Sequence, residues 1–207
     1  MEAKKLAELC YRLYESGDIS DDAAFDIEDF EDAVQSARAY KIKLDFWNSI
    51  KMEGERNVNS TWFESFDNVA VKKNETTNTY YSVLPSQVFG DLPKGRAFNL
   101  LCPVQDPNSP FIPMTKSEIW LYSSLPQDDT IYYNFDGTKI NYERFNPNIK
   151  EVYMQYIPQT SETIPDEIAY EIRDLVINQF LKPKQVGREQ DKMDDSNSDI
   201  RQPNGKQ

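Results

Sequence analysis

The sequence SDDAAFDIEDFEDAVQSARAYKIKLDFWNSIKM, from Ser20 to Met52, is the longest stretch of this chain that can form a single element. Ser20 is a good N-cap residue, and no glycine or proline follows it before Gly54. Apolar residues recur at steps of three and four, as on one face of a helix: Ile27, Phe30, Val34, Ala37, Tyr40, Leu44 and Trp47. We therefore expect a helix about 45 Å long, which a domain of this size cannot cover completely.

Charge is graded along this stretch. Acidic side chains fill its beginning, whereas Arg38 and Lys51 lie toward its end, which matches the helix dipole. Five of the acids lie close together: Asp26, Glu28, Asp29, Glu31 and Asp32. They lack the glycine and the alternate spacing of a calcium loop. We expect them to form a solvated face rather than a metal site.

Composition limits the possible functions. The 207 residues are 39% hydrophobic, which is enough to build a core, and their formal net charge is −12. Such acidity argues against ordinary nucleic-acid binding, which needs Lys and Arg to neutralise phosphates. The chain contains no histidine, so Ser-His, Cys-His and histidine-metal sites are excluded. We expect no metal and no cofactor.

The two cysteines and the N-terminal residues indicate a reducing compartment. Cys10 and Cys102 are too few and too far apart for a disulfide framework or a zinc site, and we expect Cys10 to be a small core residue. The segment Met1–Tyr14 carries charges throughout, so we expect no signal peptide. We also expect no membrane span.

The N-terminal residues predict a first helix, from Ala3 to Glu15, with Gly17 as its stop. Its predicted apolar face consists of Leu6, Leu9, Cys10 and Leu13. With the long helix it forms a helical hairpin.

Short runs beyond Gly54 predict strands. Val69–Lys73 and Thr79–Leu84 flank a polar loop and predict a hairpin. Asp136-Gly137 predicts a tight turn between Thr130–Phe135 and Thr138–Tyr142, because both residues accept positive φ. Two further strands are expected, Ser117–Leu121 and Glu151–Ile157.

Prolines break up the segment from Pro85 to Pro113. Its last loop carries the apolar pair Phe111 and Ile112, which either covers the core or meets a partner; the sequence leaves both open. Pro165 then opens a helix that we expect to end near Leu181.

The C-terminal 25 residues are polar, and their sizeable apolar groups are sparse: Val186, Met193 and Ile200. Alone this segment buries too little surface to offset its ordering entropy. We expect it to be either a plain disordered tail or a segment that docks on a partner.

These patterns predict an α+β fold. It consists of an N-terminal helical hairpin with one long helix, a small mostly antiparallel β domain with hairpins, and a C-terminal helix with an extended tail. The expected boundaries are 1–54 for the helical hairpin, 55–160 for the β region, 161–182 for a helix that packs on the helical part, and 183–207 for the tail.

The order of several motifs resembles the structural ring proteins of crAss-like tailed bacteriophages. Over roughly residues 20–182 the helical hairpin is followed by these segments: Tyr80-Tyr81-Ser82-Val83-Leu84-Pro85, Leu92-Pro93-Lys94-Gly95-Arg96, Phe111-Ile112-Pro113, Asp136-Gly137-Thr138-Lys139-Ile140, Tyr156-Ile157-Pro158 and Ile164-Pro165-Asp166-Glu167. Proteins of this family form the neck, or head-to-tail connector, under the portal.

The resemblance implies a homo-oligomeric ring without catalytic residues. The ring is expected to follow the portal's twelvefold symmetry, with DNA passing through its lumen without specific binding. The implied partners are the portal and the neighbouring tail or neck rings, and the implied location is the virion neck, with the host cytoplasm during assembly. Asp26, Asp29 and Asp32 then face either the lumen or the outside.

Two other functions stay open. One is a carboxylate-dependent phage glycan hydrolase, since the pairing of two acids is a matter of space and not of sequence. The other is an intracellular regulatory module whose tail folds on a partner. We expect no enzyme.

Overall fold

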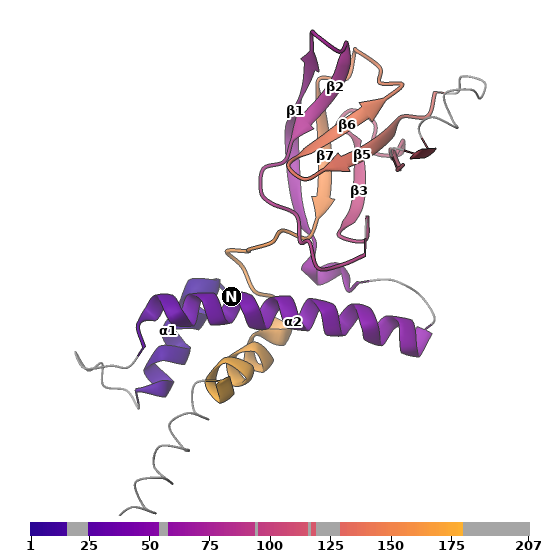
Figure 1. Cartoon of the computed structure of the whole chain (residues 1–207). Coiled ribbons are helices and arrows are strands. Elements are labelled where there is room, and N and C mark those ends of the chain that lie inside the picture. Colours follow the sequence, from indigo (N-terminus) through magenta and orange to yellow (C-terminus); the bar gives the residue numbers. More distant parts are fainter. Residues whose placement is uncertain (16–24, 54–57, 94, 116, 119–128, 180–207) are drawn as a thin grey trace, which may run out of the picture. The chain divides into compact units, whose positions relative to one another are not determined.

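The computed structural model describes residues 1–15, 25–53, 58–93, 95–115, 117–118 and 129–179. The fold is α+β, with helices and a curled, seven-stranded mixed sheet (Figure 1). The chain divides into two compact units. The first comprises the described residues of Met1–Tyr40 and Glu162–Gln207, and the second is Lys41–Ser161, which holds every strand.

Helix α1 spans Ala3–Tyr14, close to its predicted bounds. Its buried face differs from the predicted one: Leu6 and Cys10 are buried, but Leu9 and Leu13 are exposed. Tyr11 and Tyr14 take their place, because both rings pack against Phe30 of the next helix, with centroids 5.5 and 5.6 Å apart. Aromatic rings bury more surface than leucine does, and the core therefore turns toward them.

Helix α2 spans Ile27–Glu53, so the predicted start at Ser20 was wrong. Asp26 is the residue that caps it. Its Oδ1 accepts the backbone N–H of Asp29 at 3.1 Å, and Asp29 Oδ2 accepts the N–H of Asp26 at 3.0 Å. This reciprocal pair is a capping box, and it fixes the first turn.

The buried face of α2 follows the predicted stripe only in its first half. Phe30, Val34 and Ala37 are buried as expected, but Tyr40 and Trp47 are 54% and 55% exposed. In the second half, burial passes to Ile42 and Phe46. Residues four apart advance about 400° around a helix. The buried line therefore winds around α2, and each half packs within its own unit.

The C-terminal helix occupies residues 166–179, and Pro165 immediately precedes it. It buries one face, which consists of Ala169, Ile172 and Val176. This helix and α1 belong to the same unit.

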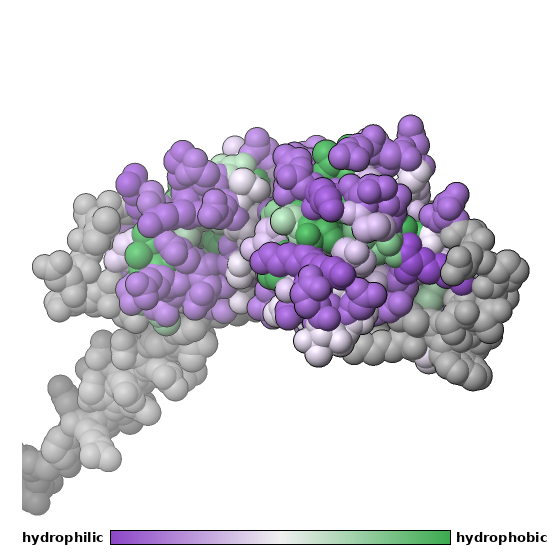
Figure 2. Space-filling view, turned by 90° about the horizontal axis from the view of Figure 1, so that it is seen from above, coloured by the Kyte–Doolittle hydropathy of each residue, from purple (hydrophilic) through white to green (hydrophobic). Residues whose placement is uncertain are grey.

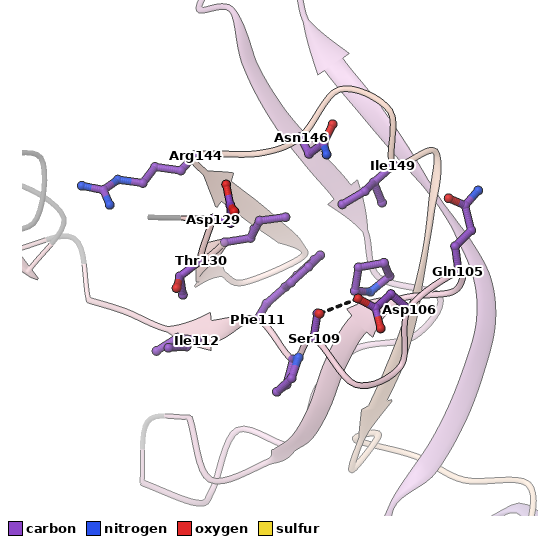
Figure 3. Close-up of a pocket in the computed structure, with 13 residues that line it drawn as sticks. Gln105, Asp106, Ser109, Phe111, Ile112, Asp129, Thr130, Arg144, Asn146 and Ile149 are labelled. Atoms are coloured by element: carbon purple, nitrogen blue, oxygen red, sulfur yellow. Dashed lines mark hydrogen bonds between the residues drawn. The ribbon is translucent and has the colours of Figure 1, made fainter. Parts of the chain in front are cut away.

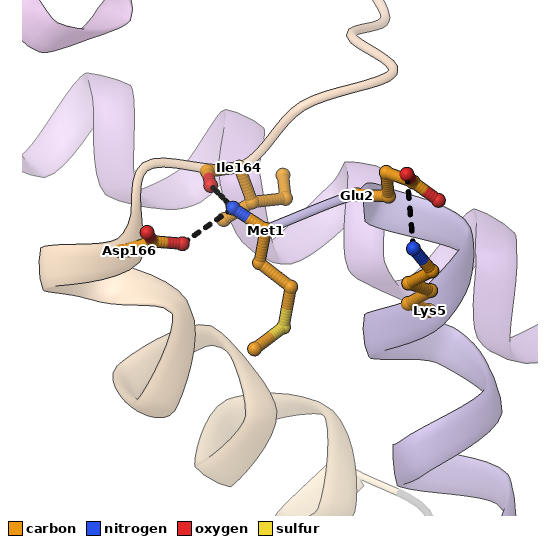
Figure 4. A network of polar contacts seen from close by, with 5 residues as sticks. All are labelled: Met1, Glu2, Lys5, Ile164 and Asp166. Atoms are coloured by element: carbon orange, nitrogen blue, oxygen red, sulfur yellow. Dashed lines mark hydrogen bonds and ion pairs between the residues drawn. The ribbon is translucent and has the colours of Figure 1, made fainter.

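The N-terminus is tied to the start of that helix (Figure 4). The α-amino group of Met1 donates to the Ile164 carbonyl at 2.8 Å and pairs with Asp166 Oδ1 at 2.5 Å. Backbone bonds continue this pairing, since Ile164 N–H donates to the Met1 carbonyl and Ala3 N–H to that of Glu162. The two ends of the first unit are thus held together by hydrogen bonds of the main chain.

In the second unit, the end of α2 connects to a short 3-10 helix, Ser60–Trp62. Asp45 Oδ2 accepts both the backbone N–H of Asn59, at 2.9 Å, and the indole N–H of Trp62, at 3.2 Å. The buried indole thereby gains the partner that its N–H requires.

The sheet has the order β3-β7-β1-β2-β6-β5-β4. The strands span Glu64–Asn74 (β1), Thr79–Val83 (β2), Phe98–Pro103 (β3), Ile112–Pro113 (β4), Tyr132–Asp136 (β5), Lys139–Glu143 (β6) and Glu151–Tyr156 (β7). Only the short β4–β5 pair is parallel. A bulge between Phe66 and Val69, where Asn68 has φ +54°, interrupts the β1–β7 register. One half of β1 then pairs with β7 and the other with β2.

Both predicted hairpins are present. β1 and β2 meet at the pair Asn74–Thr79, and β5 and β6 meet at Asp136–Lys139. The second turn lies one residue later than predicted. Its two residues are Gly137, with φ +66°, and Thr138, whereas Asp136 still belongs to the strand. Thr138 has no positive φ, so only Gly137 supplies the unusual conformation.

Strand β7 also confirms the sequence pattern. Val152, Met154 and Tyr156 are all buried, as the alternation predicted. The sheet curls far enough for Phe98 of β3 to contact Phe135 of β5, with centroids 5.4 Å apart. The core of this unit therefore lies inside the curl.

The predicted strand Ser117–Leu121 was wrong at its start, because Ser117 and Glu118 are helical; residues 119–121 lie outside the described residues. Thr115 Oγ1 accepts the Glu118 N–H at 3.3 Å, and Glu118 Oε2 accepts the Thr115 N–H at 2.7 Å. This is again a capping box.

Among the described residues, no helix has the length and apolar character needed to span a membrane.

Replacing Asp26 by alanine should lower the free energy of unfolding by about 1 kcal/mol, because the first N–H groups of α2 lose their acceptor. Urea unfolding followed by circular dichroism measures the change. Asp32→Ala, an exposed acid further along the same helix, is the matched control and should change stability by less than half as much. Equal effects would contradict the assigned cap.

Candidate functional site

A hollow of about 720 Å³ lies in the second unit, beside the edge of the sheet formed by β4 and β5 (Figure 3). Three segments surround it: the loop between β3 and β4, the residues that lead into β5, and the loop between β6 and β7. Its lining is Pro103, Gln105, Asp106, Ser109, Pro110, Phe111, Ile112, Asp129, Thr130, Ile131, Arg144, Asn146 and Ile149. This volume is within the range of ordinary ligand sites.

Asp106 shapes the first of these loops. Its carboxylate accepts the Ser109 hydroxyl at 2.5 Å and the Asn108 N–H at 3.3 Å, and its own carbonyl accepts the Ser109 N–H at 3.2 Å. Such a turn is typical of an Asp followed by Pro, Asn and Ser. Much of the hydrogen-bonding capacity of this acid is therefore used to fold the loop.

Phe111 and Ile112, which the sequence left undecided, divide the two roles between them. Phe111 is 5% exposed, and its ring packs edge-on against Tyr142, with centroids 5.6 Å apart. Its N–H donates to the Leu101 carbonyl of β3 at 2.7 Å. Ile112 is 46% exposed at the rim of the hollow. Phe111 thus covers the core, and Ile112 is available for contact.

Asp129 and Arg144 bring charge to the hollow. Asp129 is exposed and makes no hydrogen bond or ion pair with any described residue. Arg144 has φ +55°, a conformation that residues other than glycine rarely adopt. Its guanidinium lies 5.7 Å from the centre of the Tyr132 ring, and in Figure 3 the side chain extends away from Phe111. The lining of the hollow thus holds two acids, Asp106 and Asp129, and one cation, Arg144.

Behind the hollow lies a buried network of hydroxyl groups. Tyr142 O–H donates to Ser82 Oγ at 2.9 Å, and the Ser82 hydroxyl donates to the Ala70 carbonyl at 3.1 Å. Burial raises the pKa of Tyr142 above its ordinary value, and the hydrogen bond with Ser82 opposes that rise. Burial also raises the pKa of Tyr133 to about 12. These hydroxyls stay protonated at neutral pH, so they serve the core rather than acid–base chemistry.

Two other titratable groups have raised pKa values for the same reason. Burial raises the pKa of the Cys10 thiol to about 11, and desolvation raises the pKa of Glu143. Cys10 is fully buried, so its predicted role as a small core residue is confirmed. A thiol with such a pKa is a poor nucleophile.

The acids at the start of α2 are mostly solvated. Asp26, Asp29 and Asp32 are exposed, and the first two cap the helix as described above. Within the described part of the chain, no three His, Cys, Asp or Glu side chains are grouped so that they would hold a metal ion. The exposure of Asp26, Asp29 and Asp32 agrees with the expected solvated face.

A second exposed feature of this unit is the end of α2. Trp47 contacts Phe46, with ring centroids 5.4 Å apart, yet remains half exposed, and Met52 is 85% exposed. Figure 2 shows one face of the molecule, which is largely hydrophilic, with apolar side chains in small patches. The sequence pattern had placed Trp47 in the core, and only the winding of the buried line shows that it lies outside.

The other predicted contact residues, Val186, Met193 and Ile200, lie outside the described residues. Sequence reasoning missed Asp106 and Arg144 as members of a common hollow. The Asp-Pro-Asn-Ser pattern was a readable signal for the loop turn at Asp106. No local signal places Arg144 near that loop, because the two are brought together only by the sheet.

No family model matches the chain, and no curated protein matches it. The resemblance to phage connector proteins therefore stays a prediction.

Replacing Tyr133 by phenylalanine should flatten the loss of stability at alkaline pH. A buried hydroxyl with a raised pKa contributes stability that is full below pH 10 and is lost as the pH rises toward 12, because the unfolded chain releases the proton first. The loss attributable to Tyr133 is on the order of 2 kcal/mol. Urea unfolding between pH 8 and 12 measures it.

The control for this experiment is Tyr170→Phe, in which the same hydroxyl is removed from an exposed ring. Its alkaline profile should follow that of the wild type. A Tyr133→Phe profile identical to both would show that the Tyr133 hydroxyl does not titrate differently in the folded state.

Proposed function

We propose that this chain is a structural subunit of the head-to-tail connector of a tailed bacteriophage, in which copies form a ring below the portal. The observation that carries the proposal is the exposed apolar end of α2, where Trp47 is 55% and Met52 is 85% exposed. Exposed apolar side chains that lie together in one patch are typical of contact surfaces. A subunit of a ring needs such a surface on every copy.

The order of elements supports the same proposal. Several of the motifs that carry the resemblance to crAss-like phage ring proteins lie at turns and at the ends of elements. Arg96 N–H donates to the Pro93 carbonyl in one turn, and Gly137 forms another. Pro158 follows β7, and Pro165 precedes the C-terminal helix. Residues at these places determine where each element begins and ends. The resemblance likewise concerns the order of the elements along the chain.

Acidity supports a passage for DNA rather than a binding site. The net charge is −12, and exposed acids occupy the first turns of α2. A wall of this sign repels phosphate, so DNA slides past without being held. In this proposal the protein belongs to the virion neck, is assembled in the host cytoplasm, and contacts the portal and a neighbouring ring. It has no catalytic step and needs no cofactor.

The second candidate is the carboxylate-dependent glycan hydrolase. The observation that favours it is that Asp106 and Asp129 line one hollow, since glycoside hydrolysis uses two acids flanking the bond. Against it, Asp106 already accepts two hydrogen bonds that fold its own loop. Loss of turnover on cell-wall glycans in Asp129→Asn would favour this candidate over the connector.

The purified full chain should form rings, alone or when mixed with portal protein. Size-exclusion chromatography with light scattering gives the number of copies, for which we expect twelve, and negative-stain imaging gives the ring. A protein that stays monomeric in both conditions and is absent from virions would contradict the connector proposal.

Deleting residues 183–207, which lie outside the described residues, tests the docking tail predicted from sequence. The truncated chain should keep the circular dichroism spectrum and melting temperature of the full chain but bind the portal or the adjacent ring at least tenfold more weakly. Binding that is unchanged by the deletion would refute the docking role of Val186, Met193 and Ile200.

A further inference from the structure

The last turns of α2 present apolar and basic side chains together. Trp47 and Lys51 are four residues apart, so they are neighbours on one side of the helix, and Met52 follows. Lys51 is exposed and makes no hydrogen bond or ion pair with any described residue. Trp47 contacts Phe46 edge-on, and 55% of its surface remains exposed.

The hollow beside Phe111 has the complementary character. Ile112 and Ile149 provide apolar walls, and Asp129 is a carboxylate without a described partner. The one cation of the lining, Arg144, lies over the Tyr132 ring and extends away from Phe111 (Figure 3). An occupant that carries a large apolar group next to a positive charge therefore fits this hollow better than an anion does.

We propose that the end of α2 in one copy of this chain docks into the hollow beside Phe111 in the next copy, with Trp47 against the apolar walls and Lys51 facing Asp129. This inference rests on the proposed ring and names its subunit contact. The two surfaces are different parts of one unit, so the contact is heterologous. Repeated from copy to copy, such a contact generates a ring when its rotation closes.

Trp47 is expected to contribute most of the binding free energy of this contact. Burying a large apolar side chain contributes far more than an exposed ion pair does, and tryptophan is prominent among the residues that dominate interfaces. Lys51 and Asp129 chiefly determine which surfaces meet, because like charges placed opposite each other are strongly unfavourable. The two kinds of residue therefore call for two kinds of variant.

The first experiment replaces Trp47 by alanine in the full chain. Light scattering over a concentration series should show assembly weakened at least tenfold. The circular dichroism spectrum should be unchanged, because the Trp47 indole lies outside the core. Tyr170→Ala, which removes an exposed aromatic ring from the other unit, is the matched control and should assemble like the wild type. Assembly of Trp47→Ala at wild-type strength would overturn the contact.

The second experiment reverses the charges. Lys51→Glu and Asp129→Lys should each assemble at least tenfold more weakly alone. Mixed in equal amounts they should assemble again, because copies that alternate around a ring then place opposite charges at every contact. Failure of the mixture to recover would show that these two residues do not meet.

The outcomes separate the contact from the ring. Rings that form in the wild type and are insensitive to all three variants would remove the proposed contact and leave the connector proposal standing. A wild-type chain that remains monomeric at every concentration, alone and with portal, would remove both. Saturable binding of a cell-wall glycan in the hollow, abolished by Asp129→Lys while assembly persists, would assign the hollow to a small ligand instead.

Discussion

Tyr156 contacts several separate segments of the sheet-containing unit. Its ring is fully buried, stacks on Phe66 of β1 with centroids 4.6 Å apart, and contacts Phe98 of β3 at 5.4 Å. Its hydroxyl accepts the Ser86 N–H at 3.0 Å and donates to the Ser86 carbonyl at 3.1 Å. One side chain at the end of β7 thus fixes two neighbouring strands and the segment after β2. Because β7 ends there, the curl that brings β3 toward β5, and with it the loop that borders the hollow, depends on this packing.

The winding of the buried line on α2 connects the helical and sheet-containing parts of the sequence. A helix that packed in a single unit would keep its apolar residues on one stripe. Here the first half buries Phe30 and Val34, and the second half buries Ile42 and Phe46, which lie on a different side. The apolar residues left over, Tyr40 and Trp47, are those that a single stripe would have covered. The exposed surface at the end of α2 is therefore a consequence of one helix serving two units.

The sequence was most informative where one local feature determines the outcome. β7 and the two hairpins were predicted because alternation and a turn glycine require only neighbouring residues. The predicted start of α2 was wrong because Ser20 and Asp26 are both good N-cap residues. Only Asp26 has an acid three residues later that returns the hydrogen bond. The prediction of the buried face of α2 was wrong for another reason. The sequence allows either Leu44 and Trp47 or Ile42 and Phe46 to enter the core. Contacts with residues distant in sequence, such as those of Asp45 with Asn59 and Trp62, determine which pair is buried.

The roles of the two acids in the hollow depend on the partners of each. Asp106 and Asp129 line the same space, but the first folds its own loop through Ser109 and Asn108, and the second has no described partner. A catalytic pair needs two carboxylates whose environments push their pKa values apart. An interface needs only one unpaired charge beside an apolar wall, which is what Asp129 and Ile112 supply. In the proposed contact, this hollow recognises the end of α2 on another copy of the chain.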